Sequence, residues 1–390
     1  MKILLITPLY GIKGRNNLFH DTSAIHYLIK PWAIKHDVVV INIYSQSLSK
    51  IVRYKNVSER RYYRNGYQYN MDNVRIYMCE IQRLYKQKAI LDVFQSKRVM
   101  NFIQRILTEI NFHPDIIVSH VPSTSLRVIN QFDKAIPKIA ILHMTDVLNT
   151  TNNPDLLNDI SKLYNNTYAR SQSIYNSFFK LKLSNLNKAL ILSGAPVSSI
   201  NIEARMYSRK EKISILYVGK LIKRKQVDKI IEALSLFRAK FSFTLDVFGE
   251  GDQKEKLIEL GKKKLGKSIE FHAPVSHLEI LKFMKKSDIF VMPSINETLG
   301  LVYLEAMACG NLVIGSRNEG IDGIIKNKIN GFLVNPNSVI DLASTLEEIF
   351  TLNYKYLDRI IFNAQKTAHY YSDTNMAMKY LDIIKNNIIV

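Results

Sequence analysis

Cysteine is scarce in this sequence, in which Cys79 and Cys309 are the only two among 390 residues. Two cysteines make neither a disulfide framework nor a set of metal ligands. Apolar runs are short as well, and none approaches the roughly 18–20 residues of a membrane-spanning helix. The first run, Ile3–Ile6, is followed by Pro8 and is too short for the core of a signal peptide. We therefore expect a globular, cytoplasmic protein.

Residue patterns that bind metals are missing too. No Asp-x-Asp triplet occurs, and the histidines and cysteines do not cluster with the spacing of metal ligands. We therefore expect no metal site and no resident cofactor.

Acidic residues are outnumbered, with 34 Asp and Glu against 54 Lys and Arg and a formal net charge of +20. Such an excess usually meets an anionic partner. It is concentrated in residues 50–105, which hold 13 basic residues, 4 acidic residues and 7 tyrosines. This segment could contact anionic lipid on the inner face of the cell membrane, bind nucleic acid, or be a solvated basic surface over core tyrosines. No zinc spacing or RNA-binding motif supports the second interpretation, so we expect no nucleic-acid partner.

The apolar pattern indicates two α/β domains. At roughly 100–200 residues per domain, the length alone predicts two. Short apolar runs alternate with helix-length amphipathic stretches, a pattern typical of βαβ units and parallel sheets. The alternation restarts at Ile213–Val218, after a polar, charged stretch. We therefore predict two Rossmann-like parallel-sheet domains facing a central cleft, residues 1–200 and 201–371, with a C-terminal helix in 372–390 that packs back on the first domain.

The segment from Pro293 to Gly310 carries the clearest chemistry. The pattern predicts a strand ending at Met292, a short loop, and a helix that starts near Gly300. Free backbone N–H groups at a helix start suit a diphosphate, and a glycine there lets a ligand approach the backbone closely. Glu305, in the second turn, could reach ribose hydroxyls, and a glutamate in the preceding loop could reach the sugar end of the same ligand. Without further evidence, both could equally be structural or solvated carboxylates.

Five spaced motifs together resemble the retaining family-4 glycosyltransferases, which have the GT-B fold. The most specific motif has two glutamates eight positions apart. A glycine follows three positions after the first glutamate, and the second begins the run Glu-Ala-Met-Ala-Cys-Gly. In chain order, the motifs are Val218–Leu221, Lys225–Asp228, Phe248–Gly251, Glu297–Gly310 and Asn330–Val334. Several motifs in the right order are far more specific than one glycine-rich loop.

The resemblance assigns roles to individual residues. It implies that Lys220 and Lys225 bind the donor diphosphate and that Glu305 holds the ribose. Glu297 would orient the sugar as a catalytic residue, assisted by the backbone of Leu299, Gly300 and Leu301. Such cations would contribute most to catalysis by stabilising the negative charge that develops on the leaving diphosphate.

In the first domain, the resemblance assigns to His143 a catalytic contact with the donor sugar. His120 also ends an expected strand, but a lone histidine there is more often structural. The glycine pair that the family carries after its first strand is replaced here by Tyr10-Gly11-Ile12-Lys13-Gly14. We therefore expect Gly11 or Gly14 to take the place of that pair in binding the nucleotide sugar.

The chain departs from the family pattern at several positions. Lys220 replaces the usual arginine, which keeps the charge but loses the bidentate fork. Gln226 replaces a glycine, and Thr298-Leu299 replaces the frequent Gly-Phe. Residues 319–323 replace Gly-Gly-x-Pro-Glu, which puts the outer donor contact in doubt.

The expected function is transfer of a sugar from a UDP- or GDP-linked donor to a hydroxyl of a saccharide or lipid-linked acceptor, with retention. Capsule, lipopolysaccharide or glycolipid assembly would be its setting, without a metal and with peripheral membrane contact. One alternative is a sugar-nucleotide epimerase of the same architecture. The other is a non-catalytic basic scaffold that docks on membranes. The four residues Lys220, Lys225, Glu297 and Glu305 together argue against the scaffold.

Overall fold

The computed structural model describes residues 1–10, 24–47, 68–83, 91–197, 200, 212–237 and 239–388. The chain divides into two compact units. Unit 1 comprises Met1–Ser193 and Thr374–Val390, and unit 2 comprises Gly194–Asp373. The chain therefore leaves unit 1 once and returns to it for its last residues.

Unit 1 is built on an eight-stranded sheet with the order β3-β4-β2-β1-β5-β6-β7-β8. All neighbouring strands are parallel except β3, which pairs antiparallel with β4 at one edge. The strands are β1 Lys2–Thr7, β2 Asp37–Ser47, β3 Gln68–Met71, β4 Val74–Arg83, β5 Ile116–His120, β6 Lys138–Leu142, β7 Asn166–Ala169 and β8 Leu186–Leu190. The helices are α1 Ala24–Ile29, η1 Trp32–Ile34, α4 Val93–Glu109, α5 Pro122–Ile129, α6 Met144–Asn152, α7 Asp155–Leu163, α8 Gln172–Lys180 and α15 Asp373–Asn386.

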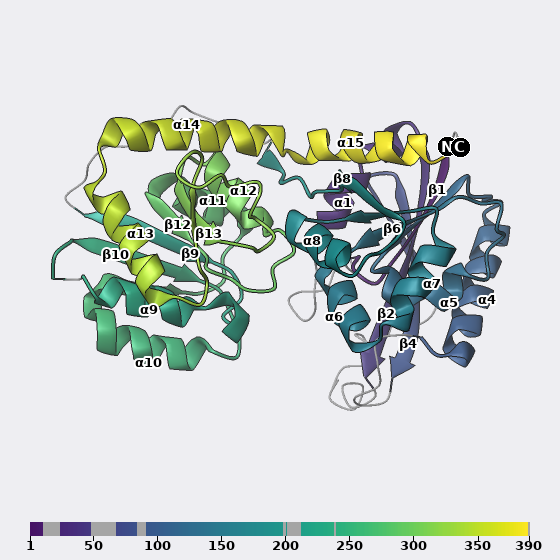
Figure 1. Ribbon diagram of the computed structural model, residues 1–390, viewed down its shortest axis with the longest axis horizontal. Helices are drawn as coiled ribbons and strands as arrows, with labels where there is room; N and C mark the ends of the chain where they lie inside the picture. Colours follow the sequence, from purple (N-terminus) through teal and green to yellow (C-terminus); the bar gives the residue numbers. More distant parts are fainter. Residues whose placement is uncertain are drawn as a thin grey trace. The chain divides into compact units, whose positions relative to one another are not determined.

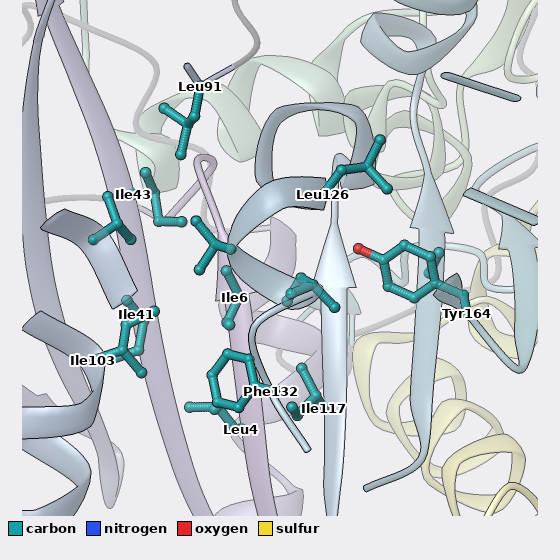
Figure 2. Packing of buried hydrophobic residues seen from close by; sticks show 14 of the residues in the cluster. Leu4, Ile6, Ile41, Ile43, Leu91, Ile103, Ile117, Leu126, Phe132 and Tyr164 are labelled. Carbon is teal, nitrogen blue, oxygen red and sulfur yellow. The ribbon is translucent and has the colours of Figure 1, made fainter. Parts of the chain in front are cut away.

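The core of unit 1 lies where the strands meet the helices that cover them. Leu4 and Ile6 of β1 and Ile41 of β2 are fully buried and pack with Ile103 of α4 (Figure 2). Every residue of β5 and β6 is buried. Such continuous burial is expected when both faces of a parallel sheet are covered, and it explains the apolar runs Ile116–Val118 and Ile139–Leu142 in these strands.

Unit 2 has a six-stranded sheet in which every pair of neighbours is parallel. Its order is β11-β10-β9-β12-β13-β14, so the first strand of the unit, β9, lies beside the fourth, β12. The strands are β9 Ile213–Val218, β10 Phe243–Phe248, β11 Ile269–His272, β12 Ile289–Val291, β13 Leu312–Ser316 and β14 Phe332–Val334. In this doubly wound order, ligands bind at the carboxyl ends of the strands where the order reverses, here between β9 and β12.

Helices cover both faces of the unit 2 sheet. Figure 1 shows α9 and α10 on one side of the strands and α11 and α12 on the other. The helices are η3 Lys223–Lys225, α9 Val227–Ser235, α10 Lys254–Leu265, η4 Gly266–Ser268, α11 His277–Lys286, α12 Leu301–Ala308, α13 Val339–Thr351 and α14 Tyr354–Tyr370. The predicted fold class, two Rossmann-like parallel-sheet domains, is confirmed.

The basic, tyrosine-rich segment belongs in part to the sheet of unit 1. Its described part contains β3 and β4, and β4 pairs with β2 over nine residues of the sheet. Tyr77 of β4 is buried, because a strand with neighbours on both sides places alternate side chains in the core. Within the described residues, no helix combines the length and the apolar character needed to cross a bilayer.

Candidate active site

The loops after β9 and β12 meet at the point where the strand order of unit 2 reverses. The backbone N–H of Ile295, after β12, donates to the carbonyl oxygen of Arg224, after β9 (2.9 Å). Lys220 and Lys225 lie on the first loop and Glu297 on the second. The sheet topology therefore brings the expected diphosphate and sugar residues to one edge, although about 70 positions of sequence separate the two loops.

Lys225 and Glu297 form a buried ion pair at this edge. The Lys225 ammonium donates to Glu297 Oε2, and Arg224 Nη1 lies 3.0 Å from the same oxygen. Burial lowers the pKa of Lys225, and the Arg224 and Lys220 charges add to this while Glu297 opposes it. Burial alone would raise the pKa of Glu297, but Lys225 and Arg224 outweigh it and the pKa is lowered. The two cations therefore favour the ionised form of Glu297, whereas burial acts against the charge on Lys225. Arg224 is a member of the site that the sequence argument did not single out.

Lys220 is exposed, and the turn that follows the neighbouring strand β10 fixes the position of its loop. Its carbonyl oxygen accepts from the Tyr217 hydroxyl (2.9 Å). The backbone N–H of the following residue, Leu221, donates to the Glu250 carbonyl oxygen (2.8 Å), and the Leu221 carbonyl oxygen accepts from the Gln253 N–H (3.0 Å). A Cβ on Gly251 would lie 2.2 Å from the Leu221 carbonyl oxygen, so only glycine allows this approach. The Gly-Glu-Gly turn thus supports the loop that presents Lys220.

Gly300 precedes the first residue of α12, where the sequence predicted an anion site. Its φ of +80° lies in the left-handed region, and an added Cβ would lie 2.8 Å from the Tyr303 ring. Leu299 is buried and Leu301, at the helix start, is partly exposed. The first turn of α12 therefore leaves backbone N–H groups without intrahelical partners next to a residue with no side chain.

Glu305 lies on the second turn of α12 and contacts α11. Its Oε1 lies 3.1 Å from His277 Nε2, and its side chain is 12% exposed. The hydrogen bond to Glu305 raises the pKa of His277, although partial burial opposes this. His277 was missed in the sequence because nothing in its own segment distinguishes it.

Glu319 supports the loop that carries Glu297. Its Oε2 accepts from the Glu297 backbone N–H (3.0 Å), and the Gly320 N–H donates to the Glu297 carbonyl oxygen (3.1 Å). Burial raises the pKa of the Glu319 carboxyl, while hydrogen bonds from the backbone N–H groups of Glu297 and Asn296 act in the opposite direction. The segment that departs from the family pattern therefore holds the loop by a side-chain carboxylate.

In unit 1, two histidines lie at the carboxyl ends of neighbouring strands. His120 ends β5, and His143 follows β6 and precedes α6. His120 Nδ1 lies 3.0 Å from His143 Nε2, and both residues are buried. The His143 N–H donates to Asp146 Oδ2 (2.8 Å), which fixes its backbone. Gly11 and Gly14, the other residues expected in unit 1, lie outside the described residues.

One group of side chains within the described residues is close enough together to hold a metal ion: Asp246, Glu270 and His272. They lie on β10 and β11. Asp246 Oδ1 approaches Nε2 of the imidazole (2.7 Å), whereas Glu270 Oε1 faces Nδ1 (3.9 Å). An imidazole binds a metal through one nitrogen at a time. Asp246 and Glu270 thus face different nitrogens of the ring, and only the contact with Asp246 is within hydrogen-bond distance.

Comparison with known proteins finds a family match within the second half of the chain and structural likeness over nearly the whole chain. Residues 200–367 match the family described as glycosyl transferases group 1. An uncharacterized glycosyltransferase of Methanocaldococcus jannaschii is 29% identical over 189 residues, which cover 48% of this chain and 48% of that protein. The chain thus matches only about half the length of that relative.

Two solved structures resemble the chain over nearly its whole length. Anabaena HepE, solved in complex with UDP and glucose, has a TM-score of 0.65 at 15% identity, covering 99% of this chain and 100% of that one. The lipopolysaccharide outer core galactosyltransferase WaaB, in its apo form, has a TM-score of 0.66 at 16% identity, covering 100% and 99%. The fold is therefore that of the GT-B glycosyltransferases.

Proposed function

We propose that the protein is a retaining, family-4 hexosyltransferase. It transfers a sugar from a UDP- or GDP-linked donor to a hydroxyl of a saccharide or lipid-linked acceptor in cell-surface polysaccharide or glycolipid assembly. The observation that carries this proposal is the meeting of Lys225, Glu297 and the Gly300 helix start at the topological switch point of unit 2. HepE with UDP and glucose and WaaB, a galactosyltransferase, support a hexose donor.

The chemistry follows from the charges at this edge. The bond between the anomeric carbon and the diphosphate oxygen breaks, and negative charge grows on the leaving diphosphate. Lys220, Lys225 and the first-turn N–H groups of α12 stabilise that charge, which is the usual strongest contribution to catalysis. The acceptor hydroxyl oxygen bonds to the anomeric carbon on the face that the diphosphate leaves, and its proton passes to the departing diphosphate. We propose no divalent cation in this step.

The remaining residues orient the donor. Glu305 accepts hydrogen bonds from the ribose hydroxyls, and Glu297 binds sugar hydroxyls through the carboxylate oxygen that its cations leave accessible. The backbone of Leu299, Gly300 and Leu301 lies along the phosphate and sugar. The resemblance gives His143 a contact with the donor sugar, and we retain that assignment.

The first test is a thermal-shift screen of the protein with nucleoside diphosphates and sugar nucleotides. A ligand present at 100 times its Kd stabilises the folded state by about 2.7 kcal/mol. We expect one base family to raise the Tm and Glu305→Ala to weaken that response. Glu348→Ala is the matched control, because it removes a partly exposed carboxylate that pairs with Lys328. Absence of any response at millimolar ligand would contradict the proposal, and conversion of a sugar nucleotide without acceptor would identify an epimerase.

We also propose that unit 1 contacts anionic membrane through the start of α4. Val93 and Phe94 are 72% and 79% exposed there, and the basic residues Lys97 and Arg98 are exposed on the same helix. Apolar side chains beside cations are what an anionic bilayer surface attracts. The assay is sedimentation with vesicles of neutral lipid, with or without an anionic lipid.

We expect binding to the anionic vesicles alone, weakened by salt and by Phe94→Ser. Phe179→Ser is the control, since Phe179 is 66% exposed on α8. Equal sedimentation at low and high salt would rule out the electrostatic form of this proposal.

A further inference from the structure

Three side chains of unit 1 form a hydrogen-bonded chain that ends at His143. The hydroxyl of Tyr380, on α15, lies 3.0 Å from His120 Nε2. The other nitrogen of that ring, Nδ1, lies 3.0 Å from His143 Nε2. The C-terminal helix is thereby linked through His120 to the residue assigned to the donor sugar.

All three rings are removed from solvent. His120 is fully buried, and Tyr380 and His143 are 1% and 7% exposed. Burial holds the pKa of His143 well below its usual range, and the buried Arg170 cation adds to this. Burial acts in the same way on His120, together with the His143 and Arg170 charges. Both imidazoles are therefore neutral near pH 7, and each carries a single N–H.

Satisfaction of the buried hydroxyl sets the direction of the chain. Within the described residues, the Tyr380 hydroxyl makes its hydrogen bond with His120 Nε2. A buried phenol that did not donate its proton would leave an unsatisfied donor, which costs roughly 1–3 kcal/mol. Tyr380 therefore donates to Nε2 of His120. The proton of that ring then resides on Nδ1 and is donated to His143 Nε2.

We propose that Tyr380 and His120 are positioning residues that hold His143 as its Nδ1–H tautomer. With Nε2 accepting from His120, the neutral ring of His143 carries its proton on Nδ1 and can only donate there. The group that it recognises is then a hydrogen-bond acceptor, such as the lone pair of a sugar oxygen. This last step rests on the proposed function, whereas the tautomer does not.

The test is ¹⁵N NMR of the full-length protein with labelled histidine, because protonated and unprotonated ring nitrogens differ widely in chemical shift. The nine histidines are assigned by single substitutions. Between pH 6 and 8 we expect protonated Nδ1 and unprotonated Nε2 for both His120 and His143. In Tyr380→Phe, which removes only the hydroxyl, both rings should lose this bias and show averaged shifts.

Tyr168→Phe is the matched control. The Tyr168 hydroxyl also links the sheet to the end of the chain, by accepting from Asn387 Nδ2 just after α15 (2.9 Å), but it is outside the chain of rings. In Tyr168→Phe, the ring-nitrogen shifts of His120 and His143 should equal those of the wild type. A protonated Nε2 on His143 in the wild type, or unchanged shifts in Tyr380→Phe, would overturn the proposal.

Kinetics separate this inference from the proposed function. Once transfer is measured, Tyr380→Phe should lower kcat by about three- to tenfold with little change in the KM for the donor, the scale of one hydrogen bond. Tyr168→Phe should not change kcat. If no transfer is found, the proposed function fails, and the NMR measurement of the tautomer still decides whether Tyr380 and His120 position His143. Equal kcat for Tyr380→Phe and wild type would contradict the positioning role.

Discussion

At the scale of single residues, the Lys225–Glu297 pair combines two roles. The two charged groups are proposed to bind the donor. Each charge also offsets the free-energy cost of burying the other. The side chains are 10% and 15% exposed, and Arg224, at 40%, adds a second cation. Removing one member of such a pair leaves the other buried without a counter-charge, which is far costlier than losing an exposed pair.

We therefore expect Glu297→Gln to lower the free energy of unfolding by about 3 kcal/mol at pH 7. The folded-state pKa of Glu297 is lowered, so its contribution is present above the unfolded-state pKa and is lost as pH falls through the folded-state value. The difference from the wild type should thus shrink in acid. Urea denaturation at pH 7 and at about pH 4 measures it. Glu347→Gln is the control, because its pair with Lys240 is largely exposed, and its effect should stay within about 0.5 kcal/mol.

At the scale of elements, the turn after β10 determines where the loop after β9 lies. Gly251 packs against the Leu221 backbone so closely that no side chain fits. Backbone cannot move away as the end of a flexible side chain can, so an added methyl group must displace one loop or the other.

Gly251→Ala should therefore lower the free energy of unfolding by about 2 kcal/mol and raise the KM for the donor by displacing Lys220. Gly266→Ala is the matched control: its φ is +60°, and nothing lies within 4 Å of an added Cβ. It should cost about 1 kcal/mol, from backbone strain alone, and leave the KM unchanged. Equal KM changes in the two variants would contradict the supporting role of the turn.

At the scale of the whole molecule, the residues proposed to bind the nucleoside diphosphate belong to one unit. Lys220, Lys225, Glu297 and Glu305 all lie in unit 2, which has its own sheet. The ends of this unit are joined to each other: the Ala195 N–H donates to Tyr371 O (3.1 Å), and the Asp373 N–H donates to Ala195 O (2.8 Å). Unit 2 is thus closed by its own hydrogen bonds.

Residues 194–373 expressed alone should therefore unfold cooperatively and bind the nucleoside diphosphate that the full chain binds, without transferring sugar. Calorimetry with and without ligand measures both properties, and Glu305→Ala in the same fragment is the control. Residues 1–193 alone should fold poorly, because the Trp32 indole N–H donates to the Ala377 carbonyl oxygen (2.8 Å) on the returning helix. A fragment of unit 2 that folds but binds no nucleotide would place the donor site elsewhere.

Much of the fold was predictable because both sheets are covered on both faces. Buried parallel strands are rich in apolar residues, so the run Ile213–Val218, expected to restart the alternation, forms β9 with the same bounds. The strands β3, β4 and β7 were not anticipated. Their polar, tyrosine-containing sequences take strand form through pairing with neighbours, and this pairing is invisible in a local pattern.

The sequence by itself determined the composition of the donor loop and helix, because Glu297, Gly300 and Glu305 lie within nine consecutive residues. It also determined the restart of the second domain, because apolar periodicity is local. Only the tertiary structure decided their partners. Glu319, His277 and Tyr380 contact Glu297, Glu305 and His120 from 22, 28 and 260 positions away. Contacts between distant positions depend on sheet order and on the return of the last helix, and neither leaves a local pattern in the chain.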